Sequence, residues 1–270
     1  MFTRQVLDYG FVRVVDTMGD DSAIVQAARV SYGDGTKAPS DDRSLIRYLM
    51  RHWHSTPFEM CEVKLHVKLP VFVARQWIRH RTANVNEYSA RYSIMDREFY
   101  VPDPQNICSQ STINKQGGAD PVEPVLADAV QGMFIDASEG SYKEYDEMLE
   151  AGVARETARM VLPINVYTQW YWKVDLHNLF HFLRLRSDPH AQYEIRVYAD
   201  AIAEFVAQWV PEAWAAFQDY RLNAMSLSAM EVECMKTLLM GADPAYENMS
   251  GREISEFEEK MKRMGVTDYD

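Results

Sequence analysis

The sequence is poor in cysteine and has no long apolar run. Its 270 residues include three cysteines, and none of them forms a CxxC pair or a spacing typical of a disulfide framework. Such sparing use of cysteine is typical of proteins in a reducing compartment. No stretch approaches the roughly 18 consecutive apolar residues of a membrane span, and the first residues alternate charged with apolar side chains, unlike a secretory leader. These absences predict a cytoplasmic protein without a membrane partner.

Basic residues are scarce as well. The 28 Lys and Arg stand against 40 Asp and Glu, which gives a formal net charge of −12. This balance disfavours general binding to nucleic acid or to an anionic membrane surface. With 47% hydrophobic residues and no internal repeat, the composition is that of an ordinary globular protein, and the length fits one large domain or two small ones.

Hydrophobic periodicity and capping residues predict more helices than strands. Asp20 or Asp21 can cap a helix that continues to Val30, and Ser40 can cap a second helix. Residues 61–69 alternate Cys, Val and Leu with Glu, Lys and His. That alternation is typical of a half-buried strand, and it is the clearest strand pattern in the chain.

The rest of the chain continues this mixture. The further predicted elements are a helix from Pro70 to about His80, a turn-rich loop over 103–124, helices over 121–149 and 154–162, a strand over 165–174, a helix capped by Asp175, and a helix opened by Pro189 that reaches Trp209. The tail from Leu227 to Met264 has helical spacing and high charge, and we interpret it as a peripheral addition.

A cluster of arginines contrasts with the acidic chain around it. Residues 75–91, RQWIRHRTANVNEYSAR, contain four Arg and one Glu, a local charge of +3. The central RHR ends the predicted helix and precedes an expected Asn-rich loop, so a single amphipathic face does not explain it. Guanidinium groups held together repel one another, and they suit forked hydrogen bonds to phosphate oxygens. The segment therefore predicts an anion site, with surface salt bridges as the alternative.

Within this cluster, Arg79-His80-Arg81 followed after seven residues by Ser89 resembles the RHR-x7-S signature of the flavin-dependent thymidylate synthases. Further blocks resemble that family in order and approximate spacing: HSTPFE (54–59), FVARQW (72–77), NEYSARYS (86–93), ARMVLP (158–163) and LRSDPHAQYEI (185–195). The resemblance covers roughly residues 1–220. It implies an α+β fold, with helices packed on a mainly antiparallel sheet in a single domain like that of the thymidylate-synthase-complementing proteins. We expect this domain to span residues 1–224, with a helical C-terminal extension over 225–270.

The resemblance also implies an activity. Enzymes of this family are methyltransferases that convert dUMP to dTMP, with 5,10-methylenetetrahydrofolate as carbon donor, FAD as hydride carrier and NADPH as the usual reductant. They form homotetramers whose active sites are shared between subunits. Cofactor, co-substrates, dUMP and the tetrameric assembly are therefore expectations for this chain, and no metal is expected.

Site residues follow from the same resemblance, position by position. The residues implied for FAD are Thr56 from a neighbouring chain, Arg79, His80, Arg81, Glu87, Asp175, Leu176, His177 and His181. The residues implied for dUMP are Gln76, Trp77, Ile78, Arg79, Glu87, Tyr88, Ser89, Ala90, Arg91, Arg159 and Arg186, with His54 near the folate and flavin rings. The residues implied in catalysis are Arg186 and Ser89.

Residue chemistry agrees with these roles. Arg186 stays protonated, so it is no general base, but it can stabilise an anion at N3 of uracil and drive electron density toward C5. Ser89 lacks a flanking G-x-S-x-G motif or an ordered Ser-His-Asp set, so we expect it to position dUMP. The chain departs from the family after Val174, where Asp175 and His181 stand at positions that often hold Asn. We expect Asp175 to act mainly as a helix cap.

Two other functions are open to the sequence. His177 and His181 have the i, i+4 spacing of zinc-binding histidines, which would suit a metal-dependent hydrolase, although the accompanying Glu is missing. The Arg-rich and aromatic segments would suit an RNA-binding scaffold, but the acidic net charge disfavours it. Residues 33–38 imitate a dinucleotide-binding glycine motif, and the proline that follows argues against that function.

Overall fold

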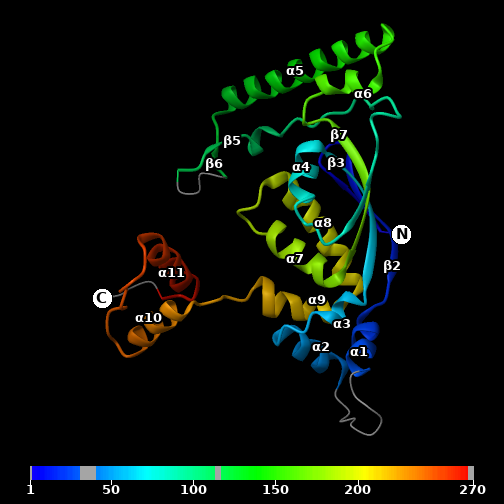
Figure 1. Cartoon of the computed structure of the whole chain (residues 1–270). Coiled ribbons are helices and arrows are strands. Elements are labelled where there is room, and N and C mark those ends of the chain that lie inside the picture. The colour runs from blue at the N-terminus through cyan, green and yellow to red at the C-terminus, as the bar shows by residue number, and fades with distance from the viewer. Residues whose placement is uncertain (1, 31–40, 113–116, 267–270) are drawn as a thin grey trace. The chain divides into compact units, whose positions relative to one another are not determined.

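A five-stranded antiparallel sheet organises the first part of the chain (Figure 1). In the computed structural model, which describes residues 2–30, 41–112 and 117–266, the strand order is β1-β2-β3-β7-β4. These strands are β1 (Thr3–Val6), β2 (Gly10–Met18), β3 (Glu62–Pro70), β4 (Asn84–Glu87) and β7 (Tyr167–Asp175). The chain divides into two compact units, Met1–Phe217 and Gln218–Asp270, and the sheet belongs to the first.

Helices cover one face of this sheet. Figure 1 shows α4, α7 and α8 on the same side of β3 and β7. The α-helices of the first unit are α1 (Asp21–Arg29), α2 (Asp42–Arg51), α3 (Thr56–Glu59), α4 (Val71–Trp77), α5 (Pro124–Glu150), α6 (Arg155–Ala158), α7 (Leu176–Arg186), α8 (Tyr193–Trp209) and α9 (Pro211–Phe217). The minor elements are 3-10 turns at Pro104–Asn106 and Arg159–Val161 and a hairpin of β5 (Cys108–Gln110) with β6 (Gly118–Pro121).

The core between sheet and helices is aromatic. Trp77 at the end of α4 is fully buried. Its ring centroid lies 4.6 Å from that of Phe182, 5.2 Å from that of Trp172 and 5.7 Å from that of Trp170. Such aromatic pairs contribute about 0.5–1.5 kcal/mol each beyond the area that they bury. Trp77 therefore anchors α4 to β7 and α7 and fixes where the following residues emerge.

Carboxylates stabilise several helix starts. Asp20 accepts hydrogen bonds from the backbone N–H groups of Ser22 and Ala23 and caps α1. Asp21, the first residue of α1, accepts hydrogen bonds from the backbone N–H groups of Glu212 and Ala213, each at 2.9 Å. The side chain of Asp21 thus satisfies two orphan donors in the first turn of α9, far away in the sequence.

The structure confirms the expected fold class and many of the expected elements. The strand expected over 61–69 is β3, and Asp20 and Asp175 cap α1 and α7. The cap of α2 is at Asp41; Ser40 and the 33–38 motif lie outside the described residues.

Other sequence-based expectations were wrong. The helix from Pro70 ends at Trp77 instead of His80, and the expected Asn-rich loop contains strand β4. The helix expected at Pro189 begins at Tyr193. No strand was expected before residue 61, whereas β1 and β2 form one side of the sheet.

The second unit is a small helical assembly. It begins with a π-helical turn at Gln218–Leu222, followed by α10 (Ala229–Leu239) and α11 (Gly251–Arg263), each opened by a Ser/Glu capping box. Cys234, Phe257 and Met261 form its buried core. The Lys260 ammonium pairs with the buried Glu231 carboxylate at 2.6 Å across the two helices.

Among the described residues, none of the helices combines the length and the apolar character needed to cross a membrane. All three cysteines are free: Cys61 and Cys234 are buried, and Cys108 is exposed.

Candidate active site

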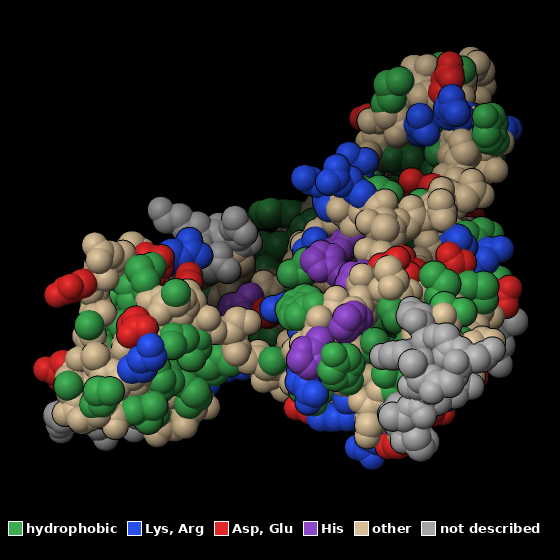
Figure 2. Space-filling view, turned by 60° about the horizontal axis from the view of Figure 1, so that its bottom comes forward, with side chains coloured by type: hydrophobic (Ala, Val, Ile, Leu, Met, Phe, Trp, Pro, Cys, Tyr) green, Lys and Arg blue, Asp and Glu red, His purple; other side chains and the backbone are tan. Residues whose placement is uncertain are grey.

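A cleft of about 290 Å³ opens where the chain leaves α4, beside β7 and α7. Its lining residues are Arg79, His80, Arg81, Thr82, Trp172, Val174, Asn178, His181, Leu185 and Arg186. Figure 2 shows histidine side chains close to Lys or Arg side chains on one face of the first unit. Since none of these described lining residues is acidic, the cleft favours an anionic ligand.

The RHR motif reaches this cleft because α4 ends early. Burial of Trp77 holds the last residue of the helix in the core, and the backbone N–H of His80 bonds to the carbonyl of Trp77 at 3.0 Å. Arg79 and Arg81 flank this turn and are exposed, so their guanidinium groups are free of the core. Strand β4 then begins at Asn84 and returns the chain to the sheet.

His80 and Arg186 meet inside the cleft although 106 residues separate them. Nε of Arg186 donates a hydrogen bond to Nε2 of His80 at 3.0 Å. Burial lowers the pKa of His80 to about 4, with further lowering by the Arg186 charge and by His181. His80 is therefore neutral near pH 7, with Nε2 as acceptor and Nδ1 as donor. Burial also lowers the pKa of Arg186, yet a guanidinium stays protonated at any working pH.

Glu87 lies at the end of β4 beside β7. Glu87 is opposite Trp170 in the antiparallel pairing of β4 with β7. The backbone N–H of the next residue, Tyr88, donates a hydrogen bond to the carbonyl of Gln169 at 2.8 Å. Oε1 of Glu87 accepts a hydrogen bond from the Thr168 hydroxyl at 2.9 Å. Two strands and one side chain thus position the carboxylate.

Ser89 lies in a turn that follows β4. Its carbonyl accepts hydrogen bonds from the backbone N–H groups of Tyr92 and Ser93, and its Oγ accepts one from the N–H of Arg91 at 3.4 Å. In the described chain no imidazole or carboxylate bonds to this hydroxyl. The geometry suits a residue that positions a ligand better than a nucleophile, which needs an adjacent base.

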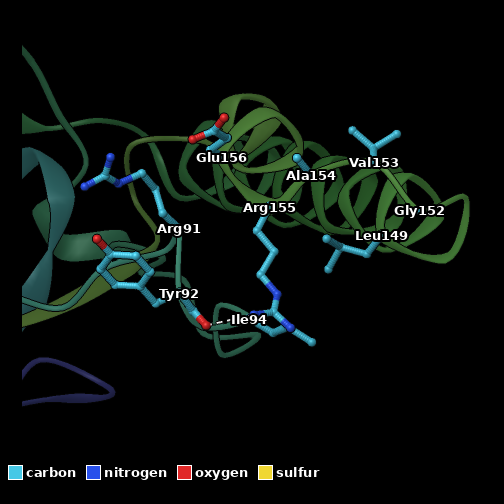
Figure 3. A pocket seen from close by; sticks show the side chains of 9 residues that line it. All are labelled: Arg91, Tyr92, Ile94, Leu149, Gly152, Val153, Ala154, Arg155 and Glu156. Carbon is cyan, nitrogen blue, oxygen red and sulfur yellow. Dashed lines mark hydrogen bonds between the residues drawn. The ribbon is translucent and has the colours of Figure 1, made fainter.

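A second cavity, of about 550 Å³, adjoins this segment. Its lining residues are Arg91, Tyr92, Ile94, Leu149, Gly152, Val153, Ala154, Arg155 and Glu156 (Figure 3). Figure 3 shows Arg155, the first residue of α6, reaching to the carbonyl of Tyr92, a hydrogen bond of 2.8 Å. Arg159 follows on the next 3-10 turn and is exposed. Arg91 and Arg155 thus line the same cavity.

Several predicted site residues lie apart from the cleft. His54, between α2 and α3, and Thr56, the first residue of α3, are both exposed. The His54 ring stacks on that of Tyr48 with centroids 5.8 Å apart. His177 is half-buried on α7 and is not among the lining residues of the cleft. Within a single chain, His54 and Thr56 are therefore not among the residues that line the cleft at the RHR motif.

Other predicted residues offer mainly backbone groups. The side chains of Trp77 and Leu176 are fully buried in the core, and Asp175 caps α7 by accepting from the N–H of Asn178 at 2.9 Å. Gln76 differs, because its Oε1 is buried without a hydrogen-bond partner among the described residues. Such an orphaned acceptor is costly unless a ligand satisfies it. Ile78, Ala90 and Tyr88 are half-buried, and the Tyr88 hydroxyl donates to the carbonyl of Ile94 at 2.9 Å.

The sequence interpretation missed several residues that the structure places at these sites. Asn178 lines the cleft, Arg155 lines the second cavity, and Thr168 holds Glu87. Asn178 lies three residues before His181 on α7, so helical spacing was an available signal. As for the alternative metal site, the described part of the chain holds no group of three or more His, Cys, Asp or Glu residues that could bind a metal ion.

Comparison with known proteins gives a consistent picture. The family model described as thymidylate synthase complementing protein matches residues 13–212. Proteins named flavin-dependent thymidylate synthase from Ruegeria pomeroyi and Rickettsia conorii are 61% and 53% identical to this chain. The first alignment covers 96% of this chain and 87% of the relative, and the second covers 97% and 93%.

Solved structures show the same fold. The UMP/dUMP methylase PolB from Streptomyces cacaoi, bound with 5-Br dUMP, is 33% identical with a TM-score of 0.73, over 81% of this chain and 99% of PolB. The structure of PolB bound with 5-Br UMP is 34% identical with a TM-score of 0.73, over 81% of this chain and 97% of PolB. The family match covers most of β2, all of β3, β4 and β7, the RHR cleft and α7, and the relatives extend over nearly the whole chain. This protein therefore belongs to the thymidylate synthase complementing protein family and is an enzyme of that family.

Proposed function

We propose that this enzyme methylates dUMP to dTMP, with 5,10-methylenetetrahydrofolate as carbon donor, FAD as flavin cofactor and NADPH as reductant. The observation that carries the proposal is the cationic cleft in which Arg186 bonds to His80 of the RHR motif. The names of the relatives and the dUMP analogue bound to PolB support the substrate class.

The donor set of the cleft fits a flavin dinucleotide. Arg79 and Arg81 offer forked donors for a pyrophosphate, and neutral His80 offers its Nδ1–H for a ring acceptor. Asn178 and His181 lie on the facing helix and add polar contacts. When bound there, FAD supplies the hydride that completes the methyl group, a redox step that no side chain of the protein can perform.

Arg186 activates the pyrimidine. Uracil C5 is a poor nucleophile, and charge must move from N3 and the ring oxygens toward C5 before it attacks a one-carbon unit. The guanidinium is half-buried and held by His80 through Nε, so its terminal amino groups can face the ring. A fixed cation in a partly dehydrated site stabilises the developing anion without reorganisation.

The phosphate of dUMP would be held by exposed arginines. Arg91 follows the Ser89 turn, and Arg159 follows α6, close in sequence to the arginine that bonds to Tyr92. Ser89 and the buried Oε1 of Gln76 would orient the nucleotide by hydrogen bonds. No residue of this set is required to form a covalent bond to the pyrimidine.

We also propose a homotetramer with shared active sites, in which Thr56 and His54 of one chain reach the RHR cleft of another. Helix α5 supports an assembly, because apolar side chains cover part of its exposed surface. Val125 is 83% exposed, Met133 is 66% exposed and Ile135 is 44% exposed. Large exposed apolar patches are typical of protein interfaces.

Release of tritium from dUMP labelled at C5 tests the reaction. We expect release with folate, NADPH and FAD together, and none when folate is omitted. We also expect a yellow protein whose flavin absorbance bleaches with NADPH and returns in air. A protein that binds no flavin and releases no tritium in the complete mixture would reject the proposal.

A further inference from the structure

Thr168 is a polar residue on an otherwise apolar, buried face. The side chains of Thr168, Trp170, Trp172 and Val174 alternate along β7 toward the helices, and each is at most 5% exposed. Burial of a hydroxyl is unfavourable unless it makes a hydrogen bond. Here the hydroxyl donates to Oε1 of Glu87 at 2.9 Å.

The strand register makes this contact rigid. Glu87 pairs with Trp170, so Thr168 is its diagonal neighbour on the same face of the antiparallel pair. The bond from the Tyr88 N–H to the Gln169 carbonyl fixes the end of the pair. Gln169 itself turns to the opposite face, where its Oε1 bonds to Nε2 of His66 at 2.8 Å.

The contact determines what Glu87 can offer a ligand. A threonine hydroxyl can donate one hydrogen bond, and that of Thr168 goes to Oε1 of Glu87. Oε2 of the exposed carboxylate is then left to accept a hydrogen bond from the ligand. An ionised carboxylate only accepts hydrogen bonds, and it repels a phosphate. Its partner must therefore be a hydroxyl or an N–H group, while the nearby arginines receive the phosphates.

We propose that Thr168 is a positioning residue that orients Glu87 toward a hydroxyl or N–H donor of the bound nucleotide. This inference rests on the proposed function, since it assumes that dUMP binds beside β4. Thr168 would not touch the ligand; it would act by holding one oxygen of the carboxylate and thereby aiming the other.

Variants at two positions test the proposal in the full-length, FAD-loaded protein. Thr168→Val keeps the shape and removes the donor, and Thr168→Ser keeps the donor. We expect Thr168→Val to raise the Kd and KM for dUMP by about 3- to 10-fold, the loss of one hydrogen bond. Thr168→Ser should restore most of this loss, and FAD content should stay unchanged. The matched control is Thr237→Val, which removes a hydroxyl that bonds to the carbonyl of Cys234 in the second unit.

A double-mutant cycle separates positioning from a merely structural role. In a Glu87→Gln background, Thr168→Val should change the Kd for dUMP by less than about twofold, because the carboxylate on which it acts is gone. Equal effects in both backgrounds, or failure of Thr168→Ser to rescue, would overturn the proposal. If Thr168→Val instead lowered the affinity for FAD and left the Kd for dUMP unchanged, the group that donates to Glu87 would belong to the flavin. That result would also overturn the proposal.

The same experiment distinguishes this inference from the proposed function. Wild-type protein that turns over dUMP while Thr168→Val behaves identically would reject the inference alone. Wild-type protein that neither binds dUMP nor releases tritium would reject both.

Discussion

Arg186→Ala removes the half-buried guanidinium whose Nε donates to Nε2 of His80 at 3.0 Å. Removal of one preorganised group that stabilises a developing anion lowers kcat by about 100- to 1,000-fold, or ~2.7–4 kcal/mol. Arg79 and Arg81 remain in the cleft, so we expect the variant to keep its flavin while it loses dTMP formation. Tritium release and the flavin absorbance of the same sample measure the two quantities.

The variant should also change the titration of His80. The pKa of His80 is lowered to about 4 by burial first and by the Arg186 charge second. Loss of the charge therefore raises this pKa toward, without reaching, the ordinary value of 6.5. NMR of the imidazole would follow the shift.

Arg184→Ala is the matched control for this substitution. Arg184 is exposed on the same helix and is not among the described lining residues of the cleft. Its loss should leave turnover close to normal. Near-normal turnover in Arg186→Ala, or an equal loss in Arg184→Ala, would refute the assignment of uracil activation to Arg186.

Three further predictions concern Ser89, His80 and Trp77. Ser89→Ala should weaken turnover about 10-fold through one lost hydrogen bond; complete inactivity in the tritium assay would indicate a chemical role instead. Because the pKa of His80 is lowered to about 4 on folding, the unfolded chain takes up this proton first as pH falls. The free energy of unfolding should therefore drop between pH 6.5 and pH 4, by about 1–2 kcal/mol after allowance for partial exposure. Urea titration of His80→Gln should lack this drop; an identical pH profile would contradict it. Trp77→Ala should cost about 3–5 kcal/mol of stability, and a thermal scan that shows no loss would mean that this core is less important than its burial indicates.

Local signals predicted the elements whose pattern is unambiguous. The strict alternation of β3 and the Asp caps of α1 and α7 are contained in a few adjacent residues. Strand β4 was missed because its residues, Asn84–Glu87, are exposed and mostly polar, and it forms only by pairing with β7. The early end of α4 likewise depends on where Trp77 packs, a tertiary effect that helix propensity does not contain.

At the candidate site, too, local motifs were predicted and tertiary contacts were not. The RHR motif and its spacing to Ser89 are visible in the sequence, and they predict a cationic site at the end of α4. The bond between His80 and Arg186 was not visible, because it joins residues far apart in the chain. Thr168 was missed because, in a strand rich in aromatic residues, a single Thr resembles an ordinary β-forming residue.

The capping of α9 by Asp21 has a consequence for synthesis of the protein. The carboxylate lies near the start of the chain, while the N–H groups that it accepts belong to Glu212 and Ala213. A nascent chain therefore lacks these partners until the ribosome has synthesised the 191 residues that follow Asp21 and end at Glu212. Until then water must hydrate the Asp21 carboxylate in place of these donors, so completion of the first unit must wait for α9 to emerge from the exit tunnel.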